Sequence, residues 1–549
     1  MPKYTSPRAA LRWLFAPDPS APPRLIPRWL FLRSLGLIFF SAFYSLLFQV
    51  RGLIGPDGLL PAGDYLRTVA EDAGALRLWY APTVFWLGSG PRFLVAMCWV
   101  GMVASLLLVL NLWPRATTFV CLIGFLSFIA VLQAFSSYQS DGMLLEAGFI
   151  CLFFAPPGLR PGLGARHPAT RASLFLLQWE WFRIYFESGL AKILSGDPEW
   201  RHLTAMNEYY QNGPLPSWVA WYAQHLPVWF HVATAGLTLA LELILIWMFF
   251  LPRRFRIVLF WIVTPWQIGI ILTSNYAFLN YIVLALGVLL LDDKYVRGFL
   301  ARLGKMWPFL MPKARPAAAQ EPAGAPPIVP VPPDGPYNVL RRILSTAGLA
   351  FAAVCLVWVF YATTAGLVWI VRPDLALLPA QPVIALEPFR FANEYGLFAV
   401  MTRGRYEIEF QGSPDGSTWT AYPFRYKPQE VNQSQRIFAP YQPRFDWNLW
   451  FASLDSWRQN QFVVAAEGRL LENSPAVLSL FAGNPFASTP PQQVRAVLWQ
   501  YWFTDWQEKK QGLWWRRKFL GLYAPQLERE PGGRFRVVAM PDPEATAPQ

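Results

Sequence analysis

Cysteine and histidine are rare in this chain, which has only four of each among its 549 residues. The cysteines, Cys98, Cys121, Cys151 and Cys355, all lie in apolar stretches, and no two of them have the CxxC spacing. Neither residue type is clustered in the way that zinc sites or disulfide frameworks require. The sequence therefore predicts no metal site, no cofactor and no thiol-exchange chemistry.

Charged residues are also scarce: Asp, Glu, Lys and Arg make up 15% of the chain, whereas 54% of it is hydrophobic. With a mean hydropathy of +0.27, the chain is too apolar for an ordinary soluble globular protein. Its net charge is nevertheless +13, and in a membrane protein such a surplus of Lys and Arg marks cytoplasmic loops. No basic run alternates with an aromatic platform of the kind that binds nucleic acid. We therefore expect an integral membrane protein in contact with the lipid bilayer, and no nucleic-acid partner.

Long apolar stretches are numerous. A transmembrane helix needs roughly 17–25 apolar residues, and the predicted fold is a polytopic α-helical membrane bundle of about nine transmembrane helices, followed by a mostly β extracytoplasmic domain. The first span is interpreted as an uncleaved signal anchor, because its apolar part is too long for a signal peptide and no small-residue cleavage pattern follows it. The nine predicted spans are 29–50, 93–112, 116–135, 142–156, 172–193, 227–251, 255–273, 276–292 and 346–371.

The distribution of Lys and Arg indicates the orientation. With the N-terminus in the cytoplasm, the inner segments hold 20 of these residues and the outer segments hold 5, as the positive-inside rule requires. Nine crossings then leave everything after residue 371 outside the cytoplasm. The predicted parts are a cytoplasmic N-terminal segment (1–28), an eight-helix membrane domain (29–292), a cytoplasmic loop (293–342) with a Pro/Ala-rich linker at 311–336, a ninth transmembrane helix (343–371) and the extracytoplasmic domain (372–549).

The last part of the chain has the pattern of a sheet. Residues 406–410 (YEIEF) alternate with period two, and the turn sequence SPDG separates them from a return strand at 418–422, which together predict a hairpin. Residues 534–538 form another alternating strand. We expect a mostly β domain with short helices at 447–456 and 493–504.

Tryptophan is abundant in the predicted outer segments. Most of these rings are expected in the core of the domain. The remainder are expected to form a surface for a protein partner or for the membrane interface, where amphipathic rings are favoured. The loops at 51–92 and 194–226 would share that outer surface. The candidates for partner binding are Trp200, Trp419, Trp447, Trp450, Trp514 and Trp515.

Charged and amide side chains occur inside several predicted spans, although one charge at the centre of a membrane helix costs roughly 2.5–3.5 kcal/mol on insertion scales. Arg183 is three residues from Glu180 and four from Glu187, so the three lie on one helix face and can form an ion-pair ladder. The other candidates either bond to neighbouring helices and loops or line a pocket. These candidates for an intramembrane polar cluster are Asp141, Glu146, Glu242, Asn275 and Asn280.

Lys192 has two open interpretations. It lies five residues beyond Glu187, about 140° around the helix, and near the outer end of its span it can extend to water. Alternatively, a poorly hydrated apolar site disfavours the charged ammonium and would suit a catalytic base. Either Lys192 or Arg183 is expected to pair with Glu242, which lies deep in the 227–251 span.

Many ordered motifs in both parts of the chain resemble the lipase maturation factor family. The resemblance covers most of the chain from about residue 30 onward. In the membrane domain the motifs are 141–149 (DGMLLEAGF), 182–200, 203–205 (LTA), 214–216 (PLP), 225–229 (HLPVW) with Glu242, and 272–280 (LTSNYAFLN) with 291–293. In the C-terminal domain they are 395–398 (YGLF), 401–403 (MTR), 412–419, 426–428 (YKP), 443–447 (PRFDW) and 514–517 (WWRR).

The resemblance implies a location and a role. Eukaryotic members are endoplasmic-reticulum membrane proteins with a lumenal C-terminal domain, and they help secreted lipases reach their active assembled form. The Ala/Arg/Pro-rich composition is typical of a GC-rich bacterial genome, for which the membrane would be the inner membrane. No cysteine follows Cys355, so a thiol-redox role does not carry over.

The chain is also distantly similar to the membrane part of vitamin K-dependent γ-carboxylase. The similar stretch is Gly189-Leu190-Ala191-Lys192-Ile193, with Trp200 downstream. This resemblance implies that a lysine at the position of Lys192 abstracts a proton.

Two functions are therefore expected as alternatives. The first is a membrane-anchored, chaperone-like maturation factor that assists the folding or assembly of a secreted client, a lipase by resemblance, without covalent chemistry. The second is a membrane-embedded enzyme with Lys192 as base and with Asp141, Glu146 and Glu242 shaping a lipid-facing or quinone-like pocket. An enclosed cavity that reaches Lys192 would favour the enzyme, and a packed ion-pair core would favour the scaffold. A transporter is a weaker third alternative, because the chain has no internal repeat.

Overall fold

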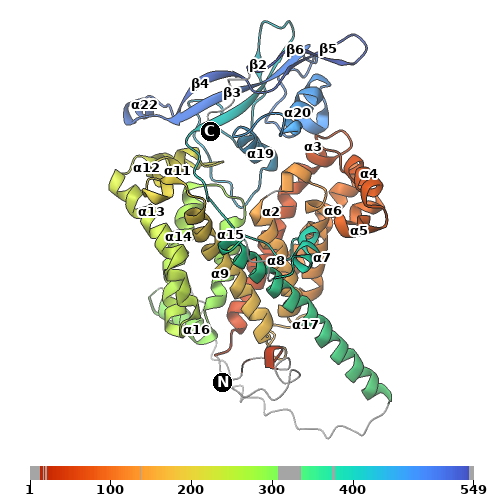
Figure 1. The fold of residues 1–549 in the computed structure, drawn as a ribbon, viewed down its shortest axis with the longest axis vertical. Coiled ribbons are helices and arrows are strands. Elements are labelled where there is room, and N and C mark those ends of the chain that lie inside the picture. Colours follow the sequence, from red (N-terminus) through yellow and green to blue (C-terminus); the bar gives the residue numbers. More distant parts are fainter. Residues whose placement is uncertain are drawn as a thin grey trace.

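The computed structural model describes residues 13–16, 18, 22–136, 138–306, 336–373 and 378–542. A helical domain forms the lower part of the molecule in Figure 1, and an antiparallel sheet lies above it. The predicted linker at 311–336 lies outside the described residues, apart from Pro336, which begins helix α17.

All nine segments predicted as membrane spans are helical. Pro91 and Pro114 begin α6 and α7, where a missing N–H leaves no hydrogen bond unmade. The hydroxyl of Thr170 caps α9 by accepting a hydrogen bond from the backbone N–H of Ser173. The helices are α2 (Leu25–Leu47), α6 (Pro91–Val109), α7 (Pro114–Ile129), α8 (Gln139–Phe154), α9 (Arg171–Leu194), α13 (Val228–Leu243) with η4 (Leu245–Phe250), α14 (Arg253–Thr273), α15 (Leu279–Gly287) with η5 (Val288–Leu290), and α17 (Pro336–Val371).

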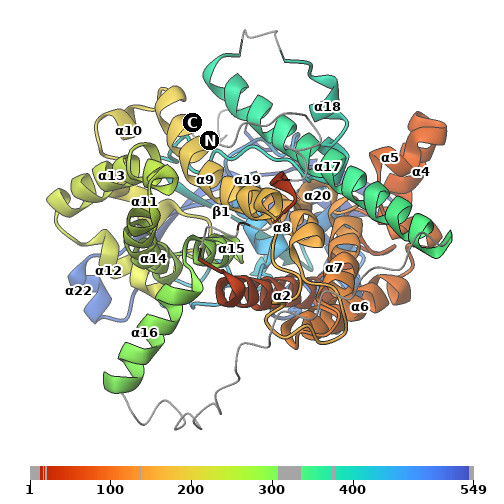
Figure 2. The same ribbon diagram turned by 90° about the horizontal axis from the view of Figure 1, so that it is seen from below.

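Helix α9 lies at the centre of the helical domain, where it packs against α8, α13, α15 and α17 (Figure 2). Within the described part of the chain, five helical segments are long and apolar enough to cross a membrane, as expected for an integral membrane protein: Leu25–Leu47, Pro91–Val109, Val228–Phe250, Arg253–Thr273 and Thr346–Val371. The other four predicted spans are shorter or, like α9, carry several charged residues.

Short helices lie between the long ones along the chain. Between α2 and α6 they are α3 (Val50–Ile54), α4 (Ala62–Ala73), η1 (Gly74–Leu76), α5 (Arg77–Tyr80) and η2 (Val84–Leu87). Between α9 and α13 they are α10 (Pro198–Arg201), α11 (Met206–Asn212) and α12 (Trp218–Gln224). The remaining short elements are η3 (Gln133–Ser136), α18 (Gln381–Ile384) and η6 (Glu387–Phe389), and α16 (Asp293–Met306) lies at the opposite end of the domain.

The C-terminal sheet is antiparallel, with strand order β2-β1-β3-β5-β6 and with β4 also paired to β3. Its strands are β1 (Arg405–Ser413), β2 (Thr420–Ala421), β3 (Gln493–Phe503), β4 (Trp515–Leu522), β5 (Gln526–Arg529) and β6 (Phe535–Ala539). The helices α19 (Arg444–Ala452), α20 (Gln461–Leu471) and α21 (Pro475–Leu478) lie between the sheet and the helical domain, and α22 (Trp506–Lys510) connects β3 to β4.

The predicted hairpin is confirmed, because β1 and β2 pair with Gln411 opposite Ala421. The strand predicted at 534–538 is confirmed as β6, and the helix predicted at 447–456 corresponds to α19. Helix α20 was not expected from the sequence.

The helix predicted at 493–504 is wrong, because these residues form β3, the central strand of the sheet. Both faces of β3 are covered, so that the consecutive residues Ala496, Val497 and Leu498 are all buried. Its sequence therefore lacks the apolar and polar alternation of a half-exposed strand. A short buried strand and a buried helix cannot be distinguished by periodicity.

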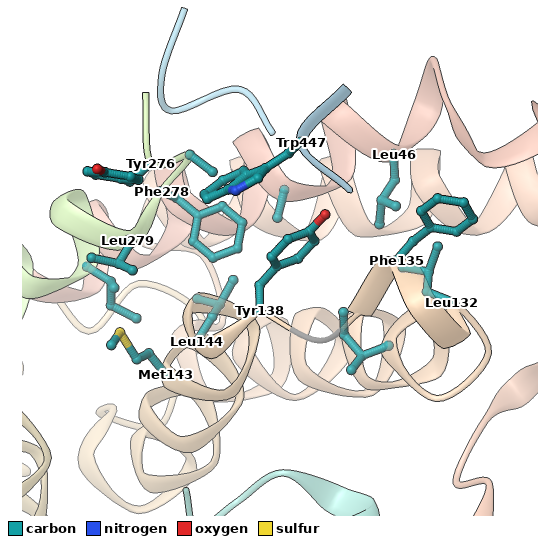
Figure 3. Close-up of a cluster of buried hydrophobic side chains, with 14 of the residues drawn as sticks. Leu46, Leu132, Phe135, Tyr138, Met143, Leu144, Tyr276, Phe278, Leu279 and Trp447 are labelled. Carbon is teal, nitrogen blue, oxygen red and sulfur yellow. The ribbon is translucent and has the colours of Figure 1, made fainter. Parts of the chain in front are cut away.

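One hydrophobic core runs through both domains. Figure 3 shows Trp447 of α19 against Tyr138 and above Phe278 of the helical domain. The rings of Trp447 and Tyr138 are 5.0 Å apart, and those of Trp447 and Tyr276 are 6.3 Å apart. Trp447 is 5% exposed. The sheet domain is therefore packed onto the helical domain through apolar contacts as well as polar ones.

Replacing Gly101 by leucine should destabilise the contact between α2 and α6. A Cβ atom at Gly101 would lie 2.5 Å from the ring of Phe43, and overpacking of this kind costs about 1–3 kcal/mol. We expect a lower Tm for the purified protein in detergent, measured by tryptophan fluorescence. Gly298→Leu on α16 is the control, because a Cβ there meets nothing within 4 Å. An equal loss of Tm in both variants would contradict this packing.

Candidate functional site

A stretch without regular secondary structure, residues 393–404, links η6 to β1 and lies against the helical domain. It is here called the docking segment. Its backbone groups bond to side chains of α8, α9 and the α9–α13 connection along much of its length. Most of the polar residues predicted inside the membrane helices are found at this contact. The candidate site is therefore the interface between the two domains.

Arg183 is the centre of the first polar group. Its guanidinium forms a close ion pair with Glu146 and donates to the carbonyl of Asn393 at 2.6 Å, and it lies 3.5 Å from Glu187. Glu146 also accepts from Asn393 N at 3.1 Å and from the hydroxyl of Tyr395 at 3.0 Å, and Glu187 accepts from Tyr395 N at 2.8 Å. These four side chains, Arg183, Glu146, Glu187 and Tyr395, are each at most 1% exposed. One guanidinium therefore serves two carboxylates, and neutral donors of the docking segment supply further hydrogen bonds to both of them.

The predicted ladder on α9 is present only in part. Arg183 pairs with Glu187, four residues on, as the spacing indicated. Glu180 does not join them, because neither of its carboxylate oxygens has a hydrogen-bond partner among the described residues. The additional partners of Arg183 come from α8 and from the docking segment, which lies 210 residues further along the chain.

Lys192 forms a second polar group with Glu242. Its Nζ lies 2.9 Å from Glu242 Oε2, donates to Leu397 O at 2.8 Å and lies 3.4 Å from Ser188 O. The side chain is 2% exposed, so the interpretation that it extends to water is wrong. Since an ammonium has three donors and all three have an acceptor here, Lys192 is held as a structural cation. Glu242 has one of the two partners that the sequence predicted for it.

The rest of the docking segment is held by residues that follow α9. Trp200 Nε1 donates to Phe398 O at 2.9 Å, and Ser195 Oγ donates to Ala399 O at 2.8 Å. Asp197 accepts from Met401 N at 2.6 Å, and Asn212 donates to Thr402 O at 2.8 Å. Ser195, Asp197 and Asn212 were not among the predicted site residues. Ser195 and Asp197 lie within the 182–200 motif and in the polar run directly after α9, whereas no sequence signal marked Asn212.

Arg405, the first residue of β1, fixes the end of the docking segment. Its guanidinium donates to the carbonyls of Gln211, Gly213 and Pro214 at 2.5–3.0 Å, at the C-terminal end of α11. A cation at this place is stabilised by the helix dipole. Arg405 also bonds to Glu407 at 2.5 Å. The first strand of the sheet thus begins at a fixed point on the helical domain.

Asp141 pairs with Arg444, which begins α19. Both carboxylate oxygens accept from the guanidinium at 2.8 Å, and the same guanidinium donates to Phe135 O at 2.6 Å. Both side chains are at most 1% exposed. A bidentate pair of this geometry is among the strongest hydrogen-bonded contacts between side chains. It joins the start of α8 to the sheet domain.

Asn275 joins the two domains through all four of its hydrogen-bonding positions. Its carbonyl oxygen accepts from Phe438 N at 2.8 Å and Ala439 N at 3.1 Å, and its amide donates to Arg436 O at 2.9 Å and Leu215 O at 3.3 Å. Asn280 instead lies inside the bundle, where it donates to Gln267 at 2.6 Å, and Gln267 donates to Tyr185 at 2.8 Å. Both asparagines therefore have structural roles.

The tryptophans predicted to bind a partner differ in exposure. Trp200, Trp447, Trp450 and Trp515 are at most 7% exposed, and so they belong to the core in this conformation. Trp419 and Trp514 are partly exposed, and a cation covers each ring: Arg495 at 3.9 Å and Lys509 at 3.1 Å. Other aromatic side chains are more accessible at the start of α13, on α12 and on α22, namely Trp229 (70% exposed), Trp506, Trp218 and Tyr222.

A cavity of about 370 Å³ reaches Lys192 and Glu242 from the side of α13 and α14. Among the described residues, no group of three or more His, Cys, Asp or Glu side chains is arranged to hold a metal ion. The packed ion-pair core expected of a scaffold is present, whereas the cavity is open between α13 and α14 and is not enclosed. The surroundings of Lys192 also favour the scaffold over the enzyme, because a base needs a free lone pair and every proton of this ammonium has an acceptor.

Asp446 is a buried acid in the sheet domain. Its carboxylate accepts from the backbone N–H groups of Tyr426 and Lys427 at 3.2 and 3.3 Å. Burial raises the pKa of Asp446 from 3.8 to about 6, although these N–H groups and the charge of Lys427 act in the opposite direction. Desolvation is therefore the dominant effect.

Two family models match the chain: "Lipase maturation factor transmembrane domain" at residues 26–298 and "Lipase maturation factor C-terminal domain" at residues 391–525. The chain is 32% identical to lipase maturation factor 2 of Gallus gallus, over 92% of this chain and 82% of that protein. It is 30% identical to lipase maturation factor 1 of Bos taurus, over 98% and 99% respectively. The protein of that name from Homo sapiens is 29% identical, over 94% and 91%. No solved structure matches the chain.

Arg444→Met should be strongly destabilising, because it leaves the carboxylate of Asp141 buried without its partner. Loss of one member of a buried pair costs about 3–5 kcal/mol. We expect a lower Tm in detergent and faster proteolysis between the two domains. The double variant Asp141→Asn with Arg444→Met should recover much of the loss.

Arg516→Met is the matched control for this experiment. Arg516 pairs with Asp505 and Glu508 at the surface, and its side chain is 50% exposed, so its ion pairs contribute about 0–1 kcal/mol. Equal effects of Arg444→Met and Arg516→Met would contradict the role of the Asp141 pair.

Asp446→Asn should change how stability depends on pH. Because the pKa of the folded state is about 6 and that of the unfolded state is 3.8, the folded protein binds the proton more tightly. The wild type therefore loses about 3 kcal/mol from this group as pH rises from about 4 to 6. The asparagine variant keeps the acceptor and lacks the titration. Its Tm relative to wild type should rise over that pH range.

Asp415→Asn provides a control of opposite sign. Backbone N–H groups of Thr418 and Ser417 lower the pKa of this exposed turn residue, so its carboxylate stabilises the fold at neutral pH and loses that contribution in acid. A Tm difference for Asp446→Asn that did not vary with pH would show that folding does not raise the pKa of Asp446.

Proposed function

Because this chain belongs to the lipase maturation factor family, we propose that it is a membrane-anchored, chaperone-like maturation factor for secreted proteins and that its clients are lipases. The membrane domain would anchor the protein, and the sheet domain would hold the client while it folds or assembles. No covalent chemistry is needed for this role. The proposed partners are the lipid bilayer and the secreted client.

The observation that carries this proposal is that charged side chains of the membrane helices bind the C-terminal domain. Arg183, Lys192 and Asp141 all hold parts of the C-terminal domain in place. These contacts join the sheet domain to the helices, and the protein also has accessible aromatic groups, among them Trp229, which is 70% exposed, and Trp506, which is 52% exposed. Protein partners commonly bind through a few large aromatic anchors. These features support binding of a client.

The proposed topology has nine crossings, with residues 1–28 and 293–342 in the cytoplasm and residues 372–549 outside it. The N-terminal end of α2 and the start of α16 meet at the end of the bundle that is farthest from the sheet (Figure 1). There Asp293 Oδ1 accepts from Ile26 N at 2.8 Å. The basic loops also gather at this end, where Arg28 donates to His167 O at 2.7 Å. Since basic loops favour the cytoplasm, this arrangement supports a sheet domain outside it.

The compartment depends on the source of the chain. In a bacterium the proposed location is the inner membrane with the sheet domain in the periplasm. In a eukaryote it is the endoplasmic-reticulum membrane with the sheet domain in the lumen. The same orientation of the chain applies in both cases.

An enzyme that uses Lys192 as its base is not favoured. The ammonium group has acceptors for all three of its protons in Glu242, Leu397 O and Ser188 O. Removing a proton would leave the carboxylate of Glu242 without its counter-ion in the interior of the bundle, where an uncompensated charge is costly. The contacts instead resemble those of Arg183, whose role is to hold the docking segment.

The test is lipase maturation in cells that lack their own maturation factor. This chain and a secreted lipase would be co-expressed, with bovine lipase maturation factor 1 as positive control. We expect an increase in the specific activity of the secreted lipase. The variant Lys192→Met with Glu242→Gln removes both charges together and should retain most of this effect if the pair is structural.

Membrane levels of each variant would be measured by immunoblot. No increase in lipase activity with the wild type, at a membrane level equal to that of the bovine control, would overturn the client proposal. A double variant that is inactive although it accumulates normally and resists proteolysis between the two domains as well as the wild type does would instead show that Lys192 takes part in chemistry. Removal of the accessible anchors by Trp229→Leu with Trp506→Leu should lower the effect more than the change of the exposed Trp99 on α6 to leucine.

A further inference from the structure

The cavity beside Lys192 has the size of a small-molecule site. It is about 370 Å³ in volume and lies between α13 and α14, with α9 and α11 behind it. Ligand pockets commonly have volumes of about 300–1,000 Å³. The feature is distinct from the docking segment, apart from Phe398, which forms part of its wall.

The walls of the cavity are almost entirely apolar. Large aromatic side chains line it, including Trp200, Tyr209 and Trp266. The two threonine hydroxyls of α13 bond to their own helix: Thr234 donates to Phe230 O at 2.7 Å, and Thr238 donates to Thr234 O at 2.8 Å. Water needs two to four polar partners to occupy a buried site. These walls are better suited to a hydrocarbon chain.

The cavity is accessible from the region where lipid would lie. Among the five long apolar segments, those of α13 and α14 are the least covered by the rest of the protein, with 28% and 17% of their residues buried. Two lining residues of α14 have little bulk on the cavity side, Pro265 and Gly269. A Cβ atom at Gly269 would meet nothing within 4 Å. A chain from the bilayer can therefore enter between the two helices.

The inner end of the cavity offers a hydrogen-bond acceptor. Glu242 is 12% exposed, whereas Lys192 is 2% exposed and has acceptors for all of its donors. Among the described residues, the hydrogen bonds to Glu242 come from Lys192 alone. Since a carboxylate has about four acceptor positions, Glu242 can accept another bond. A ligand head group that donates would fit, and an anionic head group would be repelled.

We propose that this cavity binds the acyl chain of a neutral lipid with a free hydroxyl group, of the acylglycerol class, and that the hydroxyl donates to Glu242. The chain would fill the apolar space between α13 and α14. The hydroxyl would lie at the polar inner end. This binding does not depend on the proposed role in lipase maturation.

The test is photolabelling of the full-length protein in detergent with a monoacylglycerol that carries a diazirine on its acyl chain. We expect saturable labelling in peptides from Val228–Leu243 and Arg253–Thr273, located by mass spectrometry. Gly269→Phe adds a ring to the empty space and should lower this labelling by about tenfold, because the ring occupies the position of the chain. Ile268→Phe is the matched control: the neighbouring side chain is 45% exposed and does not line the cavity.

The head group is tested by competition. The O-methyl ethers of the same lipid lack the donors and should compete about fivefold less well, the effect of losing one hydrogen bond. The matched fatty acid should also compete less well, because its carboxylate would face Glu242. Equal competition by the ethers or stronger competition by the fatty acid would overturn the assignment of the hydroxyl.

Two results would overturn the site itself. One is labelling of Gly269→Phe at the level of Ile268→Phe. The other is labelling of the wild type in these two helices that excess unlabelled monoacylglycerol does not reduce. The second result is informative even if Gly269→Phe fails to accumulate, because it uses the wild-type protein alone.

Discussion

The structure depends on the compensation of charges inside an apolar bundle. Arg183 and Glu146 are almost completely buried on neighbouring helices, and neither helix could hold its charge alone at an acceptable cost. The ion pair leaves hydrogen-bonding positions of both side chains unused. Asn393 and Tyr395 supply partners for them: Asn393 O accepts from Arg183, and Asn393 N and the hydroxyl of Tyr395 donate to Glu146. The helical domain is therefore complete only when the docking segment lies against it. This requirement couples the position of the sheet domain to the stability of the bundle.

Other polar side chains of the helical domain bind the C-terminal domain along the same interface. Lys192 holds a carbonyl of the docking segment, Asp141 holds the start of α19 through Arg444, and Asn275 holds the backbone before α19. Apolar packing of Trp447 on Tyr138 fills the space between these polar contacts. Side chains of one domain thus bind backbone groups of the other. These contacts fix the relative position of the two domains, as the proposed client-holding role would require.

Much of the fold could be predicted from the sequence, because its signals are local. Apolar length indicates the nine helices, and period-two alternation with a turn sequence indicates the hairpin at β1 and β2. The central strand β3 could not be predicted in this way, since burial on both faces removes the alternation. Local signals also indicated the contact between Arg183 and Glu187, because four residues separate them on one helix.

The remainder of the candidate site could not be predicted, because its partners are distant in the sequence. Spacing along α9 does not reveal that Lys192 meets the carbonyl of Leu397 or that Glu180 has no partner among the described residues. The acceptors are mostly backbone groups, which every residue has and which leave no trace in the amino-acid types. The exposure of the tryptophans could not be predicted either. Trp514 and Trp515 are adjacent residues of one type, yet Trp514 is partly exposed and Trp515 is buried.

The late position of the docking segment in the chain also determines when the bundle can complete its folding during synthesis. A ribosome completes α8 and α9 more than 190 residues before it reaches Asn393. During that interval Arg183, Glu146 and Glu187 exist without part of their final hydrogen bonding, and α9 stays marginal as a membrane helix. The bundle can reach its final packing only after the chain has passed residue 397. A nascent or truncated chain that ends before this point carries exposed polar groups within the membrane, which is the kind of defect that cellular quality control recognises.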